Sequence, residues 1–76
     1  MLTQDDYNFA FCAKELGYKA PIIAKYFGIK ECTVYDWFNG RSRKKEYDKY
    51  NSLSAEEKNL IVGRVKIAEL SGKAKV

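Results

Sequence analysis

Apolar residues recur at helical spacing from the start of this chain. The first apolar face, spaced i, i+3, i+4 and i+7, consists of Phe9, Cys12, Ala13 and Leu16, and it is widened by Tyr7 and Phe11. Upstream, Thr3 and Asp6 are spaced as a variant of the capping box that begins many helices. Gly17 follows the last apolar position, where glycine commonly ends a helix. The pattern therefore predicts a first helix from Thr3 to Leu16, with one face buried against the next part of the chain.

Residues 20–39 carry the same kind of pattern twice, on either side of a glycine. Pro21 suits the first turn of a helix, because the N–H that proline lacks would be unpaired there anyway. The first apolar stripe consists of Ile23, Ala24 and Phe27, and the second of Val34, Trp37 and Phe38. Between them, Gly28 adopts positive φ without a Cβ penalty, and Ile29 is expected to plug the turn into the core. These residues predict a helix, a tight turn and a second helix that begins at Glu31.

Polar side chains occupy the other face of the second helix and the segment that follows it. The face opposite the apolar stripe carries Cys32, Tyr35, Asp36 and Asn39. The following segment holds four positive charges with no acid between them, at Arg41, Arg43, Lys44 and Lys45. The whole chain has a net charge of +4, so the rest of it balances to zero. A basic cluster directly after an exposed helix favours contact with a phosphate backbone.

The remaining residues predict a connecting segment and a last helix. We expect residues 41–53 to form the basic flank and a connecting segment. Within it, we expect Tyr47 and Tyr50 to pack as a short helical turn rather than donate hydrogen bonds to phosphates. Ser54 and Glu57 have the spacing of a capping box, so a helix should run from there to about Leu70, with Ser71 and Gly72 as the stop. Gly63 weakens this pattern, and Val62 to Ile67 is also compatible with a strand. The apolar residues of this helix cover more than one stripe, which suits either dimerisation or burial in a small core.

Residues 20–39 resemble the helix-turn-helix of phage repressors and related bacterial regulators of the lambda-repressor type. The positions that match this family in type and spacing are Ala24, Gly28, Ile29, Val34 and Trp37. Asn39-Gly40, at the end of the second helix, also resembles the family, in which such an asparagine commonly meets a phosphate. The resemblance implies that the helix over residues 31–39 enters the major groove of double-stranded DNA. With the small size of the chain, it also implies a phage or mobile-element transcriptional regulator in the cytoplasm of a bacterial host cell.

We therefore expect an all-α, small helix-turn-helix domain of four to five helices. Residues 1–53 would form the DNA-binding core with its basic flank, and residues 54–72 a C-terminal helix that packs on this core or dimerises. The expected DNA-binding residues are Lys30, Glu31, Cys32, Thr33, Tyr35, Asp36, Asn39, Arg41, Arg43, Lys44 and Lys45. Of these, Glu31, Cys32, Tyr35 and Asp36 would read base edges. Thr33, Asn39 and the basic residues would meet the backbone.

The expected partner is double-stranded DNA, bound with strong salt dependence. Four to six neutralised phosphates per monomer correspond to a log–log salt slope of about −4 to −5. Because one small module buries a limited interface, useful specificity is expected from two copies on half-sites about one helical turn apart. Two acidic residues, Glu31 and Asp36, lie on the helix that would enter the groove. Because they disfavour proximity to phosphate, they are expected to favour binding to particular sequences over indiscriminate binding.

Composition argues against several other classes of protein. The 76 residues suffice for one domain, and no apolar run approaches the roughly 18 to 20 residues that span a bilayer. The chain has two cysteines and no histidine, which does not supply the four ligands of a structural zinc site. Cys12 is expected in the core and Cys32 near the groove, with no disulfide between them. We expect no cofactor and no enzymatic activity, because a histidine base, a phosphate loop and a separate pair of carboxylates are all missing from the sequence.

Two other functions fit the same sequence. One is a DNA-targeting module of a packaging, recombination or transposition protein, for which terminase small subunits offer a family comparison. Assembly beyond a dimer, or binding without a palindromic site, would favour it. The other is a protein-interaction module that inhibits a host protein. It would be favoured if reversing the charges of the basic segment had no effect.

Overall fold

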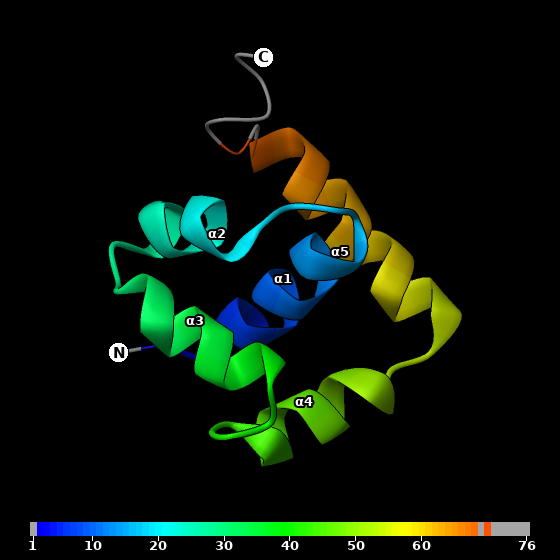
Figure 1. The fold of residues 1–76 in the computed structure, drawn as a ribbon. Helices are drawn as coiled ribbons and strands as arrows, with labels where there is room; N and C mark the ends of the chain where they lie inside the picture. Colours follow the sequence, from blue (N-terminus) through cyan, green and yellow to red (C-terminus); the bar gives the residue numbers. More distant parts are fainter. Residues whose placement is uncertain (1, 69, 71–76) are drawn as a thin grey trace.

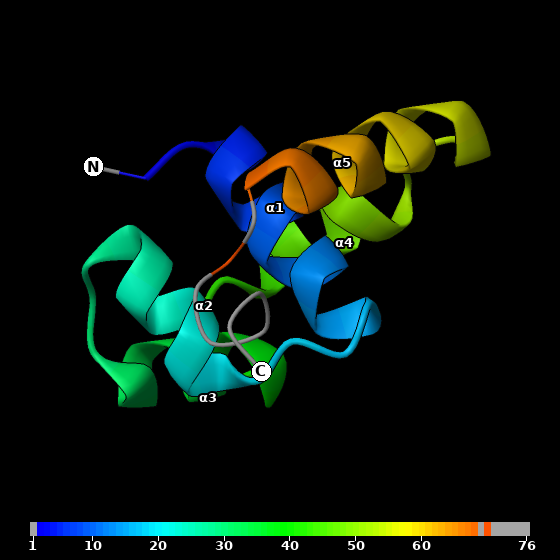
Figure 2. The same cartoon turned by 90° about the horizontal axis from the view of Figure 1, so that it is seen from above.

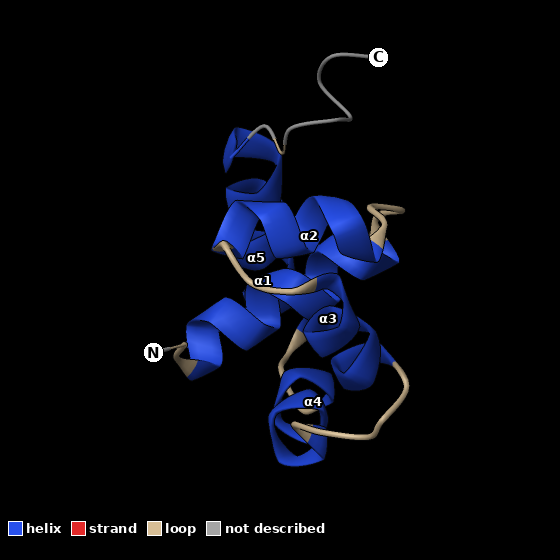
Figure 3. Ribbon diagram, turned by 60° about the vertical axis from the view of Figure 1, so that its left-hand side comes forward, coloured by secondary structure: helices blue, strands red, loops and turns tan. Residues whose placement is uncertain are grey.

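The computed structural model describes residues 2–68 and 70, and this part of the chain folds into five α-helices without a strand (Figures 1 and 3). The helices are α1 (Gln4–Glu15), α2 (Ala20–Phe27), α3 (Glu31–Phe38), α4 (Lys44–Asn51) and α5 (Ala55–Ala68). The prediction of an all-α fold with four to five helices is therefore confirmed. None of these helices has the length and apolar character needed to cross a membrane.

Helix α1 lies in the middle of the molecule, and α3 and α5 lie on opposite sides of it (Figures 1 and 2). It packs against α2, α4 and α5, and α2 also packs against α3. Because α1 has neighbours on several sides, it is buried well beyond one stripe: Tyr7, Ala10 and Phe11 are buried, as is the predicted core residue Cys12. A ring contact of 5.0 Å between the centroids of Tyr7 and Trp37 links α1 to α3.

The ends of α1 follow from local interactions that the sequence predicts. The Thr3 backbone N–H donates to the Asp6 carboxylate at 2.9 Å, and the Asp6 N–H donates to the Thr3 hydroxyl at 3.4 Å. At the other end Gly17 has φ +99°, and the Tyr18 N–H donates to the Ala13 carbonyl at 3.0 Å. The capping box and the glycine stop are thus both confirmed.

Helix α4 corrects the prediction of a mainly connecting segment over residues 41–53. The segment has few start signals, since Arg43 at the N-cap makes no side-chain cap hydrogen bond. The helix is stabilised instead by tertiary contacts with α1. Tyr50 is buried and its hydroxyl donates to the Glu15 carboxylate, while Tyr47 lies edge-on to Phe11 with ring centroids 4.9 Å apart. The expected packing of both tyrosines is confirmed, within a helix longer than one turn.

Helix α5 forms across Gly63, so the strand alternative for residues 62–67 is wrong. Ser54 caps the helix, since its hydroxyl accepts from the Glu57 N–H at 3.3 Å. Val65 is buried against the core, whereas Leu60 and Ile67 on the opposite face are 71% and 82% exposed. The predicted stop at residues 71–72 lies outside the described residues.

Candidate nucleic-acid interface

The turn between α2 and α3 sets the position of α3. Gly28 has φ +70°, the left-handed region in which glycine avoids a Cβ clash. The next N–H, that of Ile29, donates to the Ala24 carbonyl at 3.0 Å and closes the end of α2. Ala24 is buried, as expected for a small residue where two helices approach closely. Ile29 is only partly buried, so it covers the turn without entering the core fully.

Two buried residues attach α3 to the core and turn its polar face outward. Val34 and Trp37 are 0% and 3% exposed. The residues on the opposite face are exposed or partly exposed, as the sequence predicts. Glu31, Cys32 and Asn39 are exposed, Tyr35 is 48% exposed, and Asp36 is partly buried. Thr33 is also partly buried, but it lies on the side of α3 that carries Trp37. The aromatic ring of Tyr35 therefore stands in solvent on a helix whose other side is fixed.

The C-terminal end of α3 is closed by a glycine turn that leads directly into the basic segment. Gly40 has φ +76°. The Arg41 N–H donates to the Asp36 carbonyl at 2.9 Å, and the Gly40 N–H donates to the Trp37 carbonyl at 3.4 Å. These bonds satisfy carbonyls that the helix end would otherwise leave unpaired. They also fix where the chain leaves α3, and hence where Arg41 begins.

The four basic residues after α3 are not equivalent in the structure. All four are exposed, but their surroundings differ. Lys44 lies 4.0 Å from Asp48, one turn further along α4. Arg43 is directed back toward the body of the protein, with its guanidinium carbon 5.3 Å from the centroid of the Tyr7 ring. At the other end of α3, Lys30 is exposed at the N-cap. Exposed cations thus stand near both ends of α3.

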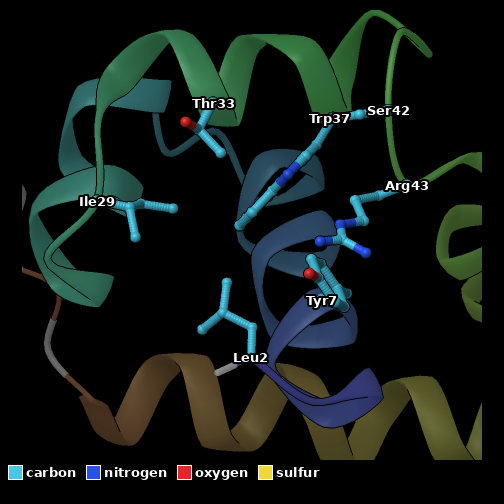
Figure 4. Close-up of a pocket in the computed structure, with 7 residues that line it drawn as sticks. All are labelled: Leu2, Tyr7, Ile29, Thr33, Trp37, Ser42 and Arg43. Atoms are coloured by element: carbon cyan, nitrogen blue, oxygen red, sulfur yellow. The ribbon is translucent and has the colours of Figure 1, made fainter.

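A hollow of about 490 Å³ lies beneath α3, between this helix, the start of the chain and the basic segment (Figure 4). Its lining consists of Leu2, Tyr7, Ile29, Thr33, Trp37, Ser42 and Arg43. The binding residues predicted from the sequence did not include Leu2, Tyr7 and Ser42. No signal within the sequence joins Leu2 and Tyr7 to residues about thirty positions later, because only the folding of α1 under α3 brings them together.

Both cysteines are free thiols, and they differ in environment. Cys12 is buried, and burial raises the pKa of its thiol, which keeps it in the less reactive protonated form. Cys32 is exposed on the outer face of α3. Among the described residues, no group of three or more potential metal ligands lies close enough together to hold an ion.

Comparisons with protein-family models, curated proteins and solved structures found no match to this chain.

Proposed function

We propose that this protein binds double-stranded DNA by inserting α3 into the major groove. The observation that carries the proposal is the outward polar face of α3, which is fixed to the core from behind and has exposed cations near both ends. An eight-residue helix is about 12 Å long, comparable to the groove width of about 12 Å. A short helix of this kind presents its side chains to only a few base pairs.

The exposed residues of α3 divide into two roles. Tyr35 is exposed on the outer face, where its ring suits contact with a thymine methyl. Glu31 and Asp36 carry carboxylates that accept from the cytosine amino group, and Cys32 adds a small contact beside them. Asn39 and Lys30 stand at the two ends of the helix, where the phosphate backbones pass.

Phosphate contact is expected mainly from Arg41 and Lys45, since both are exposed and neither makes an ion pair or a ring contact in the described part of the chain. Lys44 shares its charge with Asp48, and Arg43 and Thr33 face the hollow beneath α3. The electrostatic attraction to the DNA backbone is therefore expected to be weaker than four equivalent charges would provide. It still makes binding steeply dependent on salt, because each neutralised phosphate releases counterions.

A transcriptional regulator of a phage or mobile element, acting in the bacterial cytoplasm, is the biological role that we propose for this surface. The proposed site of homodimerisation consists of Leu60 and Ile67, the exposed large apolar residues of α5. A specific observation also favours a DNA-targeting module of a packaging, recombination or transposition protein. Because α3 and α5 lie on opposite sides of α1, a dimer formed through α5 directs its two DNA-binding helices away from each other (Figures 1 and 2).

The proposal is tested by fluorescence-anisotropy titration of the chain against a randomised duplex pool at two salt concentrations. The decisive variant reverses two exposed charges, Arg41→Glu with Lys45→Glu. We expect its affinity to fall by at least about tenfold and its log–log salt slope to shrink by about 2, because two phosphate contacts are lost. The matched control is Arg64→Glu with Lys66→Glu, which makes the same change of charge on exposed residues of α5. This control should retain most of the affinity.

Equal losses in the two variants would show that only net charge matters and would remove α3 from the interface. No binding at low salt would overturn DNA binding and direct the search to protein partners. Enrichment of a defined sequence from the pool would identify the bases that α3 reads.

A further inference from the structure

The hollow beneath α3 has the dimensions of a small-molecule site. Its volume of about 490 Å³ lies within the range of about 300 to 1,000 Å³ that is usual for such sites. Side chains reach toward it from separate parts of the chain: Leu2 precedes α1, Ile29 lies in the turn, and Thr33 comes from α3 (Figure 4). Tyr7 and Trp37 supply aromatic walls, in an edge-to-face contact that fixes both rings. The walls are thus mostly apolar and are held by the core.

The chemistry of the lining is asymmetric. Leu2 and Ile29 make one end apolar, whereas Arg43 and the hydroxyls of Ser42 and Thr33 supply the polar groups. Among the described residues, the lining contains one cation and no acid. In the described part of the chain the only ion pair joins Lys44 to Asp48, so Arg43 has no carboxylate within ion-pair distance there. Its guanidinium lies over the Tyr7 ring, and because the residue is exposed, an anion can reach it from solvent.

The backbone conformation at Arg43 is energetically unfavourable. Its φ of +57° makes it the only non-glycine residue with positive φ in the described part of the chain. A side chain in the left-handed region is unfavourable, and such conformations persist where the surrounding structure over-determines them, often at ligand sites. The strained turn is what brings the guanidinium to the edge of the hollow.

We propose that this hollow binds a small aromatic carboxylate. The acid group would pair with the Arg43 guanidinium, whose planar fork suits a carboxylate, and accept from the Ser42 or Thr33 hydroxyl. The ring would lie between Trp37 and the apolar end formed by Leu2 and Ile29. The size, the Arg43 cation and the aromatic walls all favour this class over a neutral or cationic ligand.

The site also offers a route to regulation, and this part rests on the proposed function. Thr33 belongs to α3, and Arg43 belongs to the basic segment that follows it. A carboxylate that engages Arg43 places a negative charge beneath α3, close to the surface that would face the DNA phosphates. Ligand and DNA therefore oppose each other, and by linkage each weakens the binding of the other by the same factor.

The test uses 2-naphthoate as the probe and its neutral amide, 2-naphthamide, as the matched control ligand. Binding to the full chain is followed by chemical-shift changes of backbone amides and of the indole N–H of Trp37, the single tryptophan. We expect saturable shifts confined to the lining residues, with 2-naphthoate bound about tenfold more tightly than the amide. Arg43→Gln should abolish this preference, whereas Arg64→Gln on α5 should leave it intact.

Equal binding of the two ligands by the natural chain, or shifts that do not saturate or do not cluster at the lining, would overturn the proposal. This comparison needs no variant, so it holds even if Arg43→Gln folds poorly. A duplex titration with and without 2-naphthoate separates the two proposals. Ligand binding without any duplex affinity would leave the site standing and remove the DNA function. Duplex affinity without ligand binding would remove the ligand site and leave the DNA function standing.

Discussion

At the scale of single residues, Tyr50 does the most to join the helices. It is 1% exposed on α4, its hydroxyl donates to the Glu15 carboxylate on α1, and Lys58 of α5 lies over its ring at 5.1 Å. Burial, and then the hydrogen bond to Glu15, raise the pKa of Tyr50 well above its ordinary value. The buried phenol is therefore stable only in its protonated form.

This residue makes stability depend on alkaline pH. Because the folded pKa is raised, the stabilisation is fully present below the ordinary tyrosine pKa of about 10 and is lost as the pH rises above it. Tyr50→Phe should cost about 1 kcal/mol at neutral pH through loss of the hydrogen bond, and should reduce the alkaline loss. Urea denaturation at neutral pH and above about pH 10 measures both effects.

The control for this prediction is Tyr47→Phe, the same change on the same helix at an exposed position. Tyr47→Phe should change neither the stability at neutral pH nor its loss at alkaline pH appreciably. Burial also raises the pKa of the Cys12 thiol, so a smaller alkaline loss of the same sign should persist in Tyr50→Phe. An undiminished alkaline loss in that variant would show that another group causes it.

At the scale of helices and turns, two glycines allow the same substitution to be compared in opposite settings. A Cβ added at Gly28 or Gly63 meets no atom within 4 Å, so neither substitution causes a steric clash with a neighbour. Gly28 has φ +70° in the turn before α3, whereas Gly63 lies inside α5. The effect of each substitution therefore depends on the backbone conformation alone.

We expect Gly28→Ala to destabilise the fold by about 1 to 2 kcal/mol, because alanine is strained in the left-handed region. We expect Gly63→Ala to stabilise it by about 0.5 to 1 kcal/mol, because glycine weakens a helix interior. Thermal unfolding of both variants tests the pair. Destabilisation by Gly63→Ala would mean that close packing at that position, rather than helix propensity, decides the outcome.

At the scale of the whole molecule, the positions of α3 and α5 on opposite sides of α1 constrain any dimer. Leu60 and Ile67 lie on the face of α5 opposite the buried residue Val65, and they point away from the core. Pairing of two molecules through this stripe would leave both α3 faces open. It would also place them on the two outer sides of the dimer, which suits two separate duplexes better than adjacent half-sites on one duplex.

This arrangement predicts bridging of DNA. A bead-bound duplex that carries the protein should recruit a second, labelled duplex, and Leu60→Glu with Ile67→Glu should abolish recruitment while preserving binding to one duplex. Asn59→Glu, which adds a charge at a neighbouring exposed position, serves as the control. Sedimentation equilibrium of the same variants reports the oligomeric state. A dimer that survives the double substitution, or one that binds a single palindrome without recruitment, would contradict the arrangement.

Local interactions allowed the sequence by itself to determine most helix ends. The cap at Thr3, the glycine turns at Gly17 and Gly28, and the cap at Ser54 each involve residues within five positions of one another, so they can be identified without knowing the fold. Helical periodicity likewise predicted which side of α3 is buried, because Val34 and Trp37 alternate with polar residues at the period of a helix.

Tertiary structure alone decided the rest. Helix α4 forms because Tyr50 is buried against α1, a contact that spans 35 positions and has no local signal. The inward direction of Arg43 and the hollow beneath α3 depend on Tyr7, which lies far away in the sequence. The opposite placement of α3 and α5 depends on how both pack around α1. In each case the deciding energy comes from burial between distant segments, which periodicity and capping do not encode.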